Sequence, residues 1–159
     1  MNKTMYCGVT LAMLCFVMLI GGCAAAGSTH SSHKRGRLIT PNRIYTQTQW
    51  TQEELERDVA VRSMRVTRYA SYHMVCVNTS EKPHVHDKHD AVVTMLGGRA
   101  RLHLGIKTFV LNPGDVVEIP RGNLHWVENL GNKNPTEAFV VFSPPYHGKD
   151  KRFVNVPSQ

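Results

Sequence analysis

Residues 114–129 read GDVVEIPRGNLHWVEN, and this stretch decides the fold class. DVVEI is a short alternating run, a pattern typical of a β-strand. Pro120 and Gly122 then form a turn signal, and His125 begins a second apolar stretch. The segment therefore predicts two strands joined by a turn, with a histidine at the start of the second strand.

The same pattern of strand and turn continues through most of the chain. From Val61 onward short alternating runs occur, separated by Gly, Pro, Asn and Asp: SMRVTRY, YHMVCVN, AVVTML, ARLHLGI, TFVL and AFVVFS. Many short strands predict an all-β sandwich or a closed barrel, because closure removes exposed strand edges. One helix of about two turns is predicted over residues 51–59, TQEELERDV, which open with a capping box.

A second histidine-rich stretch, residues 84–90, reads HVHDKHD. In an extended chain His84 and His86 project from one face, and Asp90, four residues after His86, is expected on that face too. Imidazoles with a carboxylate suit first-row divalent metals, and His125 is the natural further ligand. His89 is an alternative to Asp90, although strand parity points it to the opposite face unless a bulge intervenes. We therefore predict one divalent transition metal (Zn, Cu, Mn, Fe or Ni), and the alternative is a set of histidines without metal.

These two stretches resemble the two conserved motifs of the cupin family. The first motif (Gly, five residues, His-x-His, three or four residues, Glu, six residues, Gly) corresponds to Asn78, His84, His86, Asp90 and Gly97. The second (Gly, five residues, Pro-x-Gly, two residues, His, three residues, Asn) is met in full by Gly114, Pro120, Gly122, His125 and Asn129. The resemblance implies a single cupin-type, jelly-roll-like β-barrel with its core at about residues 60–145, preceded by the short helix.

The chain departs from the first motif at two positions. Asn78 replaces a glycine, which is acceptable because Asn adopts positive φ more readily than most residues with a side chain. Asp90 replaces the usual glutamate and is one methylene shorter. Either the backbone moves inward at this point, or Asp90 is a weak ligand or a partner of the ligands.

The resemblance does not decide between an enzyme and a binding protein, because the family includes dioxygenases, isomerases, decarboxylases, binding modules and storage proteins. Three histidines and a carboxylate leave about two open positions on a six-coordinate metal, enough to bind or transform a small polar molecule. The alternative is a non-catalytic module that holds a small ligand or a metal.

An enzyme would also need an acid, a base or a cation inside the barrel. The candidates Arg99, Arg101 and His103 alternate with apolar residues, and we expect the apolar face inside. His73, a lone histidine in a strand, is left out of the site.

The N-terminus has the layout of an export signal. Residues 1–22 read as a signal peptide, with an apolar run from Met5 to Ile20 that is short for a membrane-spanning helix. LIGGC, residues 19–23, resembles the lipobox of bacterial lipoproteins, which implies that Cys23 is lipidated. We expect an exported, membrane-anchored lipoprotein facing the periplasm, on the outer membrane of a Gram-negative cell because Ala24 follows the cysteine. Residues 23–45 are expected to form a flexible basic tether, and residues 46–159 the barrel domain.

Length and composition limit the remaining possibilities. The 159 residues suit one domain, and the charge of +7 is partly concentrated in the tether, so no nucleic-acid binding is predicted. Cys76 is the one cysteine within the predicted barrel, which excludes an internal disulfide there and favours a buried, inert thiol.

Two further expectations concern the metal and the last residues. Outside the cell membrane copper and zinc outcompete iron, so we expect Fe(II) dioxygenase chemistry to be disfavoured. Residues 143–159, with two prolines and a charged cluster, are expected to leave the barrel and pack across its outside or onto a neighbour. A homodimer is implied by the resemblance alone.

Overall fold

The computed structural model describes residues 37–46 and 49–156. The predicted signal peptide, the predicted lipidation site Cys23 and most of the tether lie outside these ranges. Within them, no helix is both long enough and apolar enough to cross a membrane.

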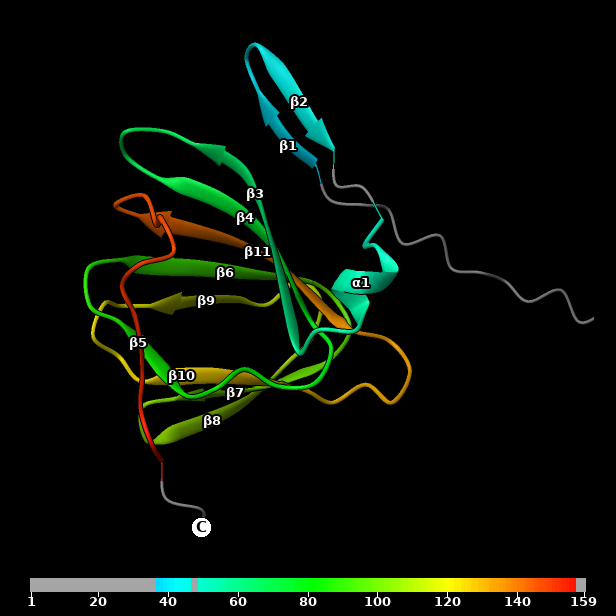
Figure 1. The fold of residues 1–159 in the computed structure, drawn as a ribbon, viewed down its shortest axis with the longest axis vertical. Helices are drawn as coiled ribbons and strands as arrows, with labels where there is room; N and C mark the ends of the chain where they lie inside the picture. The colour runs from blue at the N-terminus through cyan, green and yellow to red at the C-terminus, as the bar shows by residue number, and fades with distance from the viewer. Residues whose placement is uncertain (1–36, 47–48, 157–159) are drawn as a thin grey trace, which may run out of the picture. The chain divides into compact units, whose positions relative to one another are not determined.

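Two antiparallel five-stranded sheets face each other and form the barrel (Figure 1). The first sheet has the order β3 (Val59–Val66), β4 (Ser71–Val77), β11 (Thr136–Ser143), β6 (Asp90–Gly97) and β9 (Val116–Ile119). The second has the order β12 (Lys151–Phe153), β5 (His84–His86), β10 (His125–Asn129), β7 (Ala100–Leu104) and β8 (Lys107–Leu111). The prediction of an all-β, jelly-roll-like barrel is therefore confirmed.

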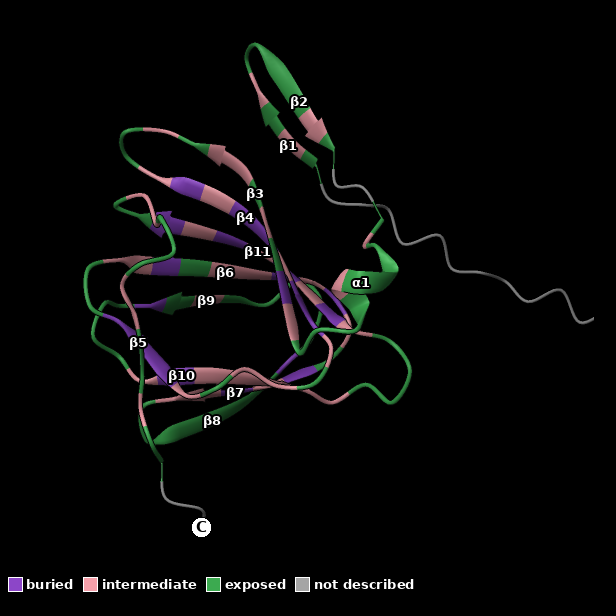
Figure 2. Cartoon of the chain, in the orientation of Figure 1, coloured by how far each residue is buried: buried purple, intermediate pink, exposed green. Residues whose placement is uncertain are grey.

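The core lies between the two sheets and is built from alternate residues of each strand (Figure 2). On β7, Ala100 and Leu102 are buried, at 0% and 1% exposure, while the alternating residues Arg101 and His103 are only partly covered. The expectation that the apolar face of this strand lies inside is confirmed, because apolar burial stabilises the barrel and charged side chains keep their hydration outside.

The helix is shorter than predicted. α1 spans only Gln52–Leu55, although the capping box between Thr51 and Glu54 is present. Asn78 stabilises the end of this helix, since its side-chain Nδ2 donates to the carbonyls of Glu54 and Arg57 at 3.2 and 2.7 Å. No non-glycine residue in the described ranges has positive φ, so Asn78 serves as a hydrogen-bonding residue and does not take over a glycine conformation.

A hairpin occupies the segment expected to be the end of the tether. β1 (Arg37–Thr40) and β2 (Arg43–Thr46) pair with each other in an antiparallel two-stranded sheet. Ordered strands thus begin about ten residues before the predicted start of the barrel domain.

The expectation that the residues after β11 leave the barrel is wrong. β12 pairs with β5, with Lys151 opposite His86 and Phe153 opposite His84. The pairing satisfies backbone groups along β5 that would otherwise form an open sheet edge. As a consequence, residues 144–153 lie beside the histidine-bearing strand.

Candidate metal centre

Three of the predicted ligands come together inside the barrel. His84 and His86 lie on β5, His125 lies on β10, and one potential ligand atom of each lies within 4.8 Å of the others. The strands bring them together through the pairing of His84 with His125 and through a 2.8 Å hydrogen bond from Gly122 N–H to the His86 carbonyl. Their exposure is 1%, 5% and 5%, so the cluster is shielded from bulk water.

The hydrogen bonds of the three rings favour the same tautomer. Each Nδ1 lies at hydrogen-bond distance from an acceptor: the Lys82 carbonyl for His84 (2.8 Å), the Asn123 carbonyl for His125 (2.9 Å) and the Asp150 carboxylate for His86 (3.1 Å). Carbonyl and carboxylate oxygens only accept, so each Nδ1 carries the proton and donates it. The Nε2 atoms therefore keep their lone pairs, as metal ligands require.

The three imidazoles are held neutral. Burial, together with the neighbouring His125, lowers the pKa of His84 from its ordinary 6.5 to about 3. Burial also lowers the pKa of His125 to about 4 and lowers that of His86, where the hydrogen bond to Asp150 partly opposes the effect. Neutral imidazole is the form that binds metal, so the rings are ready to act as ligands near pH 7.

Asp150 connects the ligand His86 to a second histidine, His89. Its carboxylate accepts from Nδ1 of both rings and from the Lys88 backbone N–H, and its side chain is only 7% exposed. Burial alone would raise the pKa of Asp150, but these hydrogen bonds outweigh it and lower the pKa. Asp150 thus orients His86 as an ionised partner, and His89 supports Asp150 from outside the group of three.

Asp90 is not part of the group. Its carboxylate binds the Arg121 backbone N–H at 2.9 Å and the Arg121 guanidinium, and its side chain is 41% exposed. On β6 the cavity is lined by Ala91, Val93 and Met95. Side chains alternate between the two faces of a strand, so Asp90 belongs to the other face of β6. A role for Asp90 as a fourth ligand stays a prediction from the sequence. The structure gives the inward position to Ala91.

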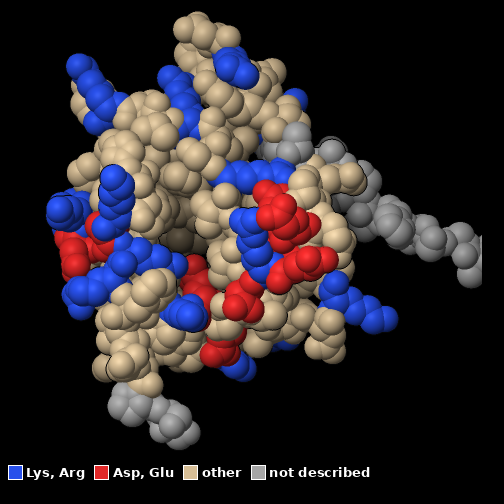
Figure 3. All heavy atoms as spheres, in the orientation of Figure 1, with Lys and Arg blue, Asp and Glu red and all other residues tan. Residues whose placement is uncertain are grey.

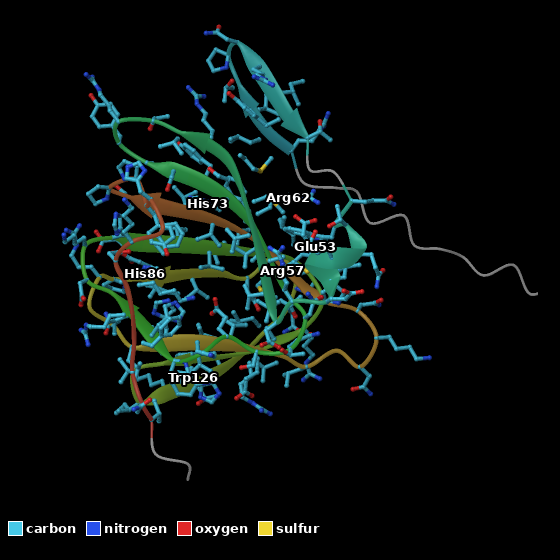
Figure 4. All side chains as sticks on the ribbon, in the orientation of Figure 1. Glu53, Arg57, Arg62, His73, His86 and Trp126 are labelled. Atoms are coloured by element: carbon cyan, nitrogen blue, oxygen red, sulfur yellow. The ribbon has the colours of Figure 1, made fainter. Side chains whose placement is uncertain are left out.

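The other histidines and arginines considered from the sequence lie away from the group. Arg101 and His103 both bind Glu128, and the His103 ring stacks on Trp126. His73 is 5% exposed and neither ring nitrogen has a hydrogen-bond partner, although its ring packs edge-on against Phe142 at 5.5 Å. Figure 4 labels His86, His73 and Trp126 on their separate strands.

A cavity of about 130 Å³ adjoins the three histidines. Most of its lining is apolar, from valines of β3, β4 and β6 to Leu102 of β7 and Phe142 of β11. Val61 lines the cavity and is 56% exposed, so the cavity reaches the surface along β3. Figure 3 shows a hollow on this face with acidic and basic side chains around it.

Four polar residues of the lining, Thr136 among them, were missed by the sequence analysis. Glu81, Tyr146 and Lys151 join the histidines in the cavity wall, and the Lys151 ammonium lies 3.9 Å from the Glu81 carboxylate. Nothing in the local sequence marks Tyr146, Asp150 or Lys151, because their place depends on the pairing of β12 with β5, far along the chain.

The donor set fits a divalent transition metal. Three buried, neutral imidazoles with their Nδ1 atoms committed elsewhere present three nitrogen ligands of the kind that zinc, copper, iron and nickel accept. Three protein ligands leave at least one coordination position for a small molecule from the cavity. The cluster therefore has the composition of an open site and not of a closed structural one.

Comparisons with known proteins agree with this fold. The family profile of the cupin domain matches residues 73–142. An uncharacterized protein of Aquifex aeolicus is 36% identical over 93 residues, which cover 58% of this chain and 75% of the relative. Among solved structures, KdgF from Halomonas sp. has a TM-score of 0.52 and 22% identity, over 56% of this chain and 82% of KdgF. A double-stranded β-helix protein of Klebsiella pneumoniae has a TM-score of 0.54 and 19% identity, over 69% of this chain and 99% of that one.

At such identities the two solved structures show the fold alone. The family profile identifies a cupin domain at residues 73–142, and the two solved structures share its fold.

Proposed function

We propose that this protein is an exported, lipid-anchored metalloprotein that binds or transforms a small molecule at a three-histidine site. The observation that carries the metal part is the common arrangement of His84, His86 and His125, whose Nδ1 atoms all donate to acceptors outside the cluster. That arrangement leaves three nitrogen lone pairs for one cation. A bound metal would act as a Lewis acid on a polar group of the ligand.

The residues around the site suit a molecule with one polar end. The histidines, Glu81 and Lys151 gather the polar groups of the cavity wall, while the valines and Phe142 repel water from the rest. A ligand would therefore turn its polar end toward the histidines and bury its apolar body.

The chemistry of the site is compatible with turnover but does not require it. Glu81 and Tyr146 are inward groups that could hold or move a proton, and Arg99, Arg101 and His103, once considered for such a role, are not among the cavity-lining residues. Burial raises the pKa of Glu81, and the charge of the neighbouring Lys151 opposes this effect. Dioxygenase- or isomerase-like reactions are candidates, and a non-catalytic binding module is the alternative.

The membrane part of the proposal depends on the sequence at Cys23. A lipobox after an apolar run predicts a diacylated cysteine and a location at the periplasmic face of a membrane. Cys23→Ser is expected to abolish incorporation of labelled palmitate and to move the protein from the membrane fraction to the soluble fraction. Cys15→Ser is the matched control and should leave both unchanged.

The metal part is tested by elemental mass spectrometry on full-length protein purified in detergent. Wild type is expected to contain about one zinc or copper per chain, and His125→Ala to lose it. His103→Ala, a histidine of the same sheet outside the group, should retain the metal. Wild-type protein that binds no metal after incubation with zinc would contradict the proposal, and stoichiometric native iron would contradict the preference for zinc or copper.

A further inference from the structure

An ion pair lies in the cavity wall that the histidines also line. Lys151 and Glu81 both line it, with side chains 27% and 14% exposed and a nitrogen–oxygen distance of 3.9 Å. β12 places Lys151 opposite His86, and a 2.8 Å hydrogen bond from Glu81 N–H to the Val127 carbonyl fixes Glu81 beside β10. Both charges are therefore held by backbone pairing and not by long flexible loops.

The charge of Lys151 acts on the metal-binding end of the cavity. The pairing of β12 with β5 sets Lys151 opposite His86, and its side chain lines the cavity together with the three histidines. One cation thus lies beside the same three rings that would hold a metal. An additional ligand in this place meets both the histidines and Lys151.

The charges around the site leave a divalent metal incompletely balanced. The three imidazoles are neutral, the carboxylate of Glu81 is offset by Lys151, and Asp150 behind His86 contributes at most one negative charge, because it is also paired with His89. A carboxylate at position 91 would supply a second negative charge, but the residue there is Ala91. The neighbouring carboxylate, Asp90, is paired with Arg121. At least one positive charge would remain in a largely apolar cavity, where an uncompensated charge is costly.

We propose that the cavity binds a small organic monoanion, whose charged end lies between the three histidines and Lys151 and whose apolar body packs against the valines. This inference rests on the proposed metal site. A short branched carboxylate has the required chemistry, since carboxylate oxygens accept from an ammonium and also bind transition metals. An apolar cavity of about 150 Å³ holds benzene, so a cavity of about 130 Å³ suits a ligand of roughly six non-hydrogen atoms.

Isobutyrate and its neutral isostere isobutyramide are suitable probes, because each has six non-hydrogen atoms. Calorimetric titration of zinc-loaded, full-length protein in detergent is expected to show isobutyrate binding at least about tenfold more tightly than isobutyramide. Lys151→Met should weaken isobutyrate by roughly 10- to 100-fold and leave isobutyramide nearly unchanged. Glu81→Gln should strengthen isobutyrate, because the carboxylate of Glu81 no longer competes for Lys151.

Lys107→Met is the matched control, since Lys107 is an exposed lysine of β8 and does not line the cavity. It should bind both probes as wild type does. Zinc affinity is measured first for every variant, which separates loss of the metal site from loss of anion recognition.

The outcomes distinguish this inference from the proposed function. If wild type binds zinc but shows equal affinity for the two probes, or if Lys151→Met retains both zinc and isobutyrate affinity, the anion site is overturned and the metal site stands. If wild type binds no zinc, both proposals fail. Opposite effects of the Lys151 and Glu81 variants at unchanged zinc affinity would support the inference.

Discussion

The two faces of the sheet that contains β10 each bring histidine and carboxylate together, with different results. Inside, His125 and its two partners each use one ring nitrogen for an acceptor and leave the other toward the cavity. Outside, His103 has its Nε2 at 3.2 Å from Glu128 and its Nδ1 at 3.4 Å from the Thr108 hydroxyl. The ring of His103 also stacks on Trp126, with centroids 4.0 Å apart.

The difference shows what makes a histidine available as a ligand. A ring with both nitrogens occupied and partial contact with water is a structural element of the surface. A buried ring with one nitrogen fixed has a defined tautomer and a lone pair aimed in one direction. The same strand thus carries a candidate ligand and, at the next residue, a surface stacking partner.

The largest effect is expected on acidification, which should lower the free energy of unfolding through the buried histidines of the inner face. The pKa values of His84 and His125, about 3 and about 4, lie below the 6.5 of an exposed ring, so protons favour the unfolded chain as the pH falls below about 6.5. At pH 5 each of the two should cost about 2 kcal/mol of unfolding free energy in the metal-free protein.

Urea unfolding at pH 7 and pH 5 measures this loss. His84→Gln should reduce the pH dependence, and His103→Gln should leave it unchanged. Equal stability of wild type at the two pH values would contradict the burial argument.

Removing the carboxylate behind His86 should have the next largest effect. Asp150→Asn is expected to lower zinc affinity roughly 10- to 100-fold, because a partner behind a ligand orients the ring and raises its basicity. Competition with a chromogenic zinc chelator measures the change. Glu128→Gln, which removes the carboxylate on the outer face, serves as control, and a comparable loss in that variant would show that the two faces are not distinct.

The smallest effect is expected at Asp90. Asp90→Ala should change zinc affinity by less than about threefold, because the Asp90 carboxylate is bound to Arg121 and the inward position on β6 belongs to Ala91. The same chelator competition applies. A tenfold or greater loss would restore Asp90 as the fourth ligand that the sequence predicts.

The fold could be predicted from the sequence because the second motif is complete. Pro120, Gly122 and His125 occupy a turn and the start of a strand, where Gly122 has φ of 77°. Asn129, the last residue of that motif, accepts from the Thr136 hydroxyl at 2.9 Å and donates to the Asn78 carbonyl at 3.0 Å, so it connects three segments. The three histidines of the cluster followed from the same two motifs.

The carboxylate position was harder to predict, because the first motif permits two spacings. Three residues after His86 select Asp90 and end the motif at Gly97, whereas four residues select Ala91 and end it at Gly98. Gly98 has φ of 77°, and a Cβ there would lie 2.7 Å from the Pro135 carbonyl oxygen. The structural requirement for glycine thus lies at Gly98 and favours the longer spacing. Counting alternate residues onward from His86 does not show which residue of β6 points inward, because β5 ends at His86 and the chain turns before β6 begins.

The completion of the site by β12 has a consequence for the order of biosynthesis. His84 and His86 emerge from the ribosome more than sixty residues before Asp150, which binds His86, and Lys151, which begins the strand paired with theirs. A nascent or truncated chain that ends before β12 lacks the carboxylate that orients His86 and the cation beside the cavity. The proposed metal site is therefore complete only after residue 150 has been synthesised and has folded back onto β5.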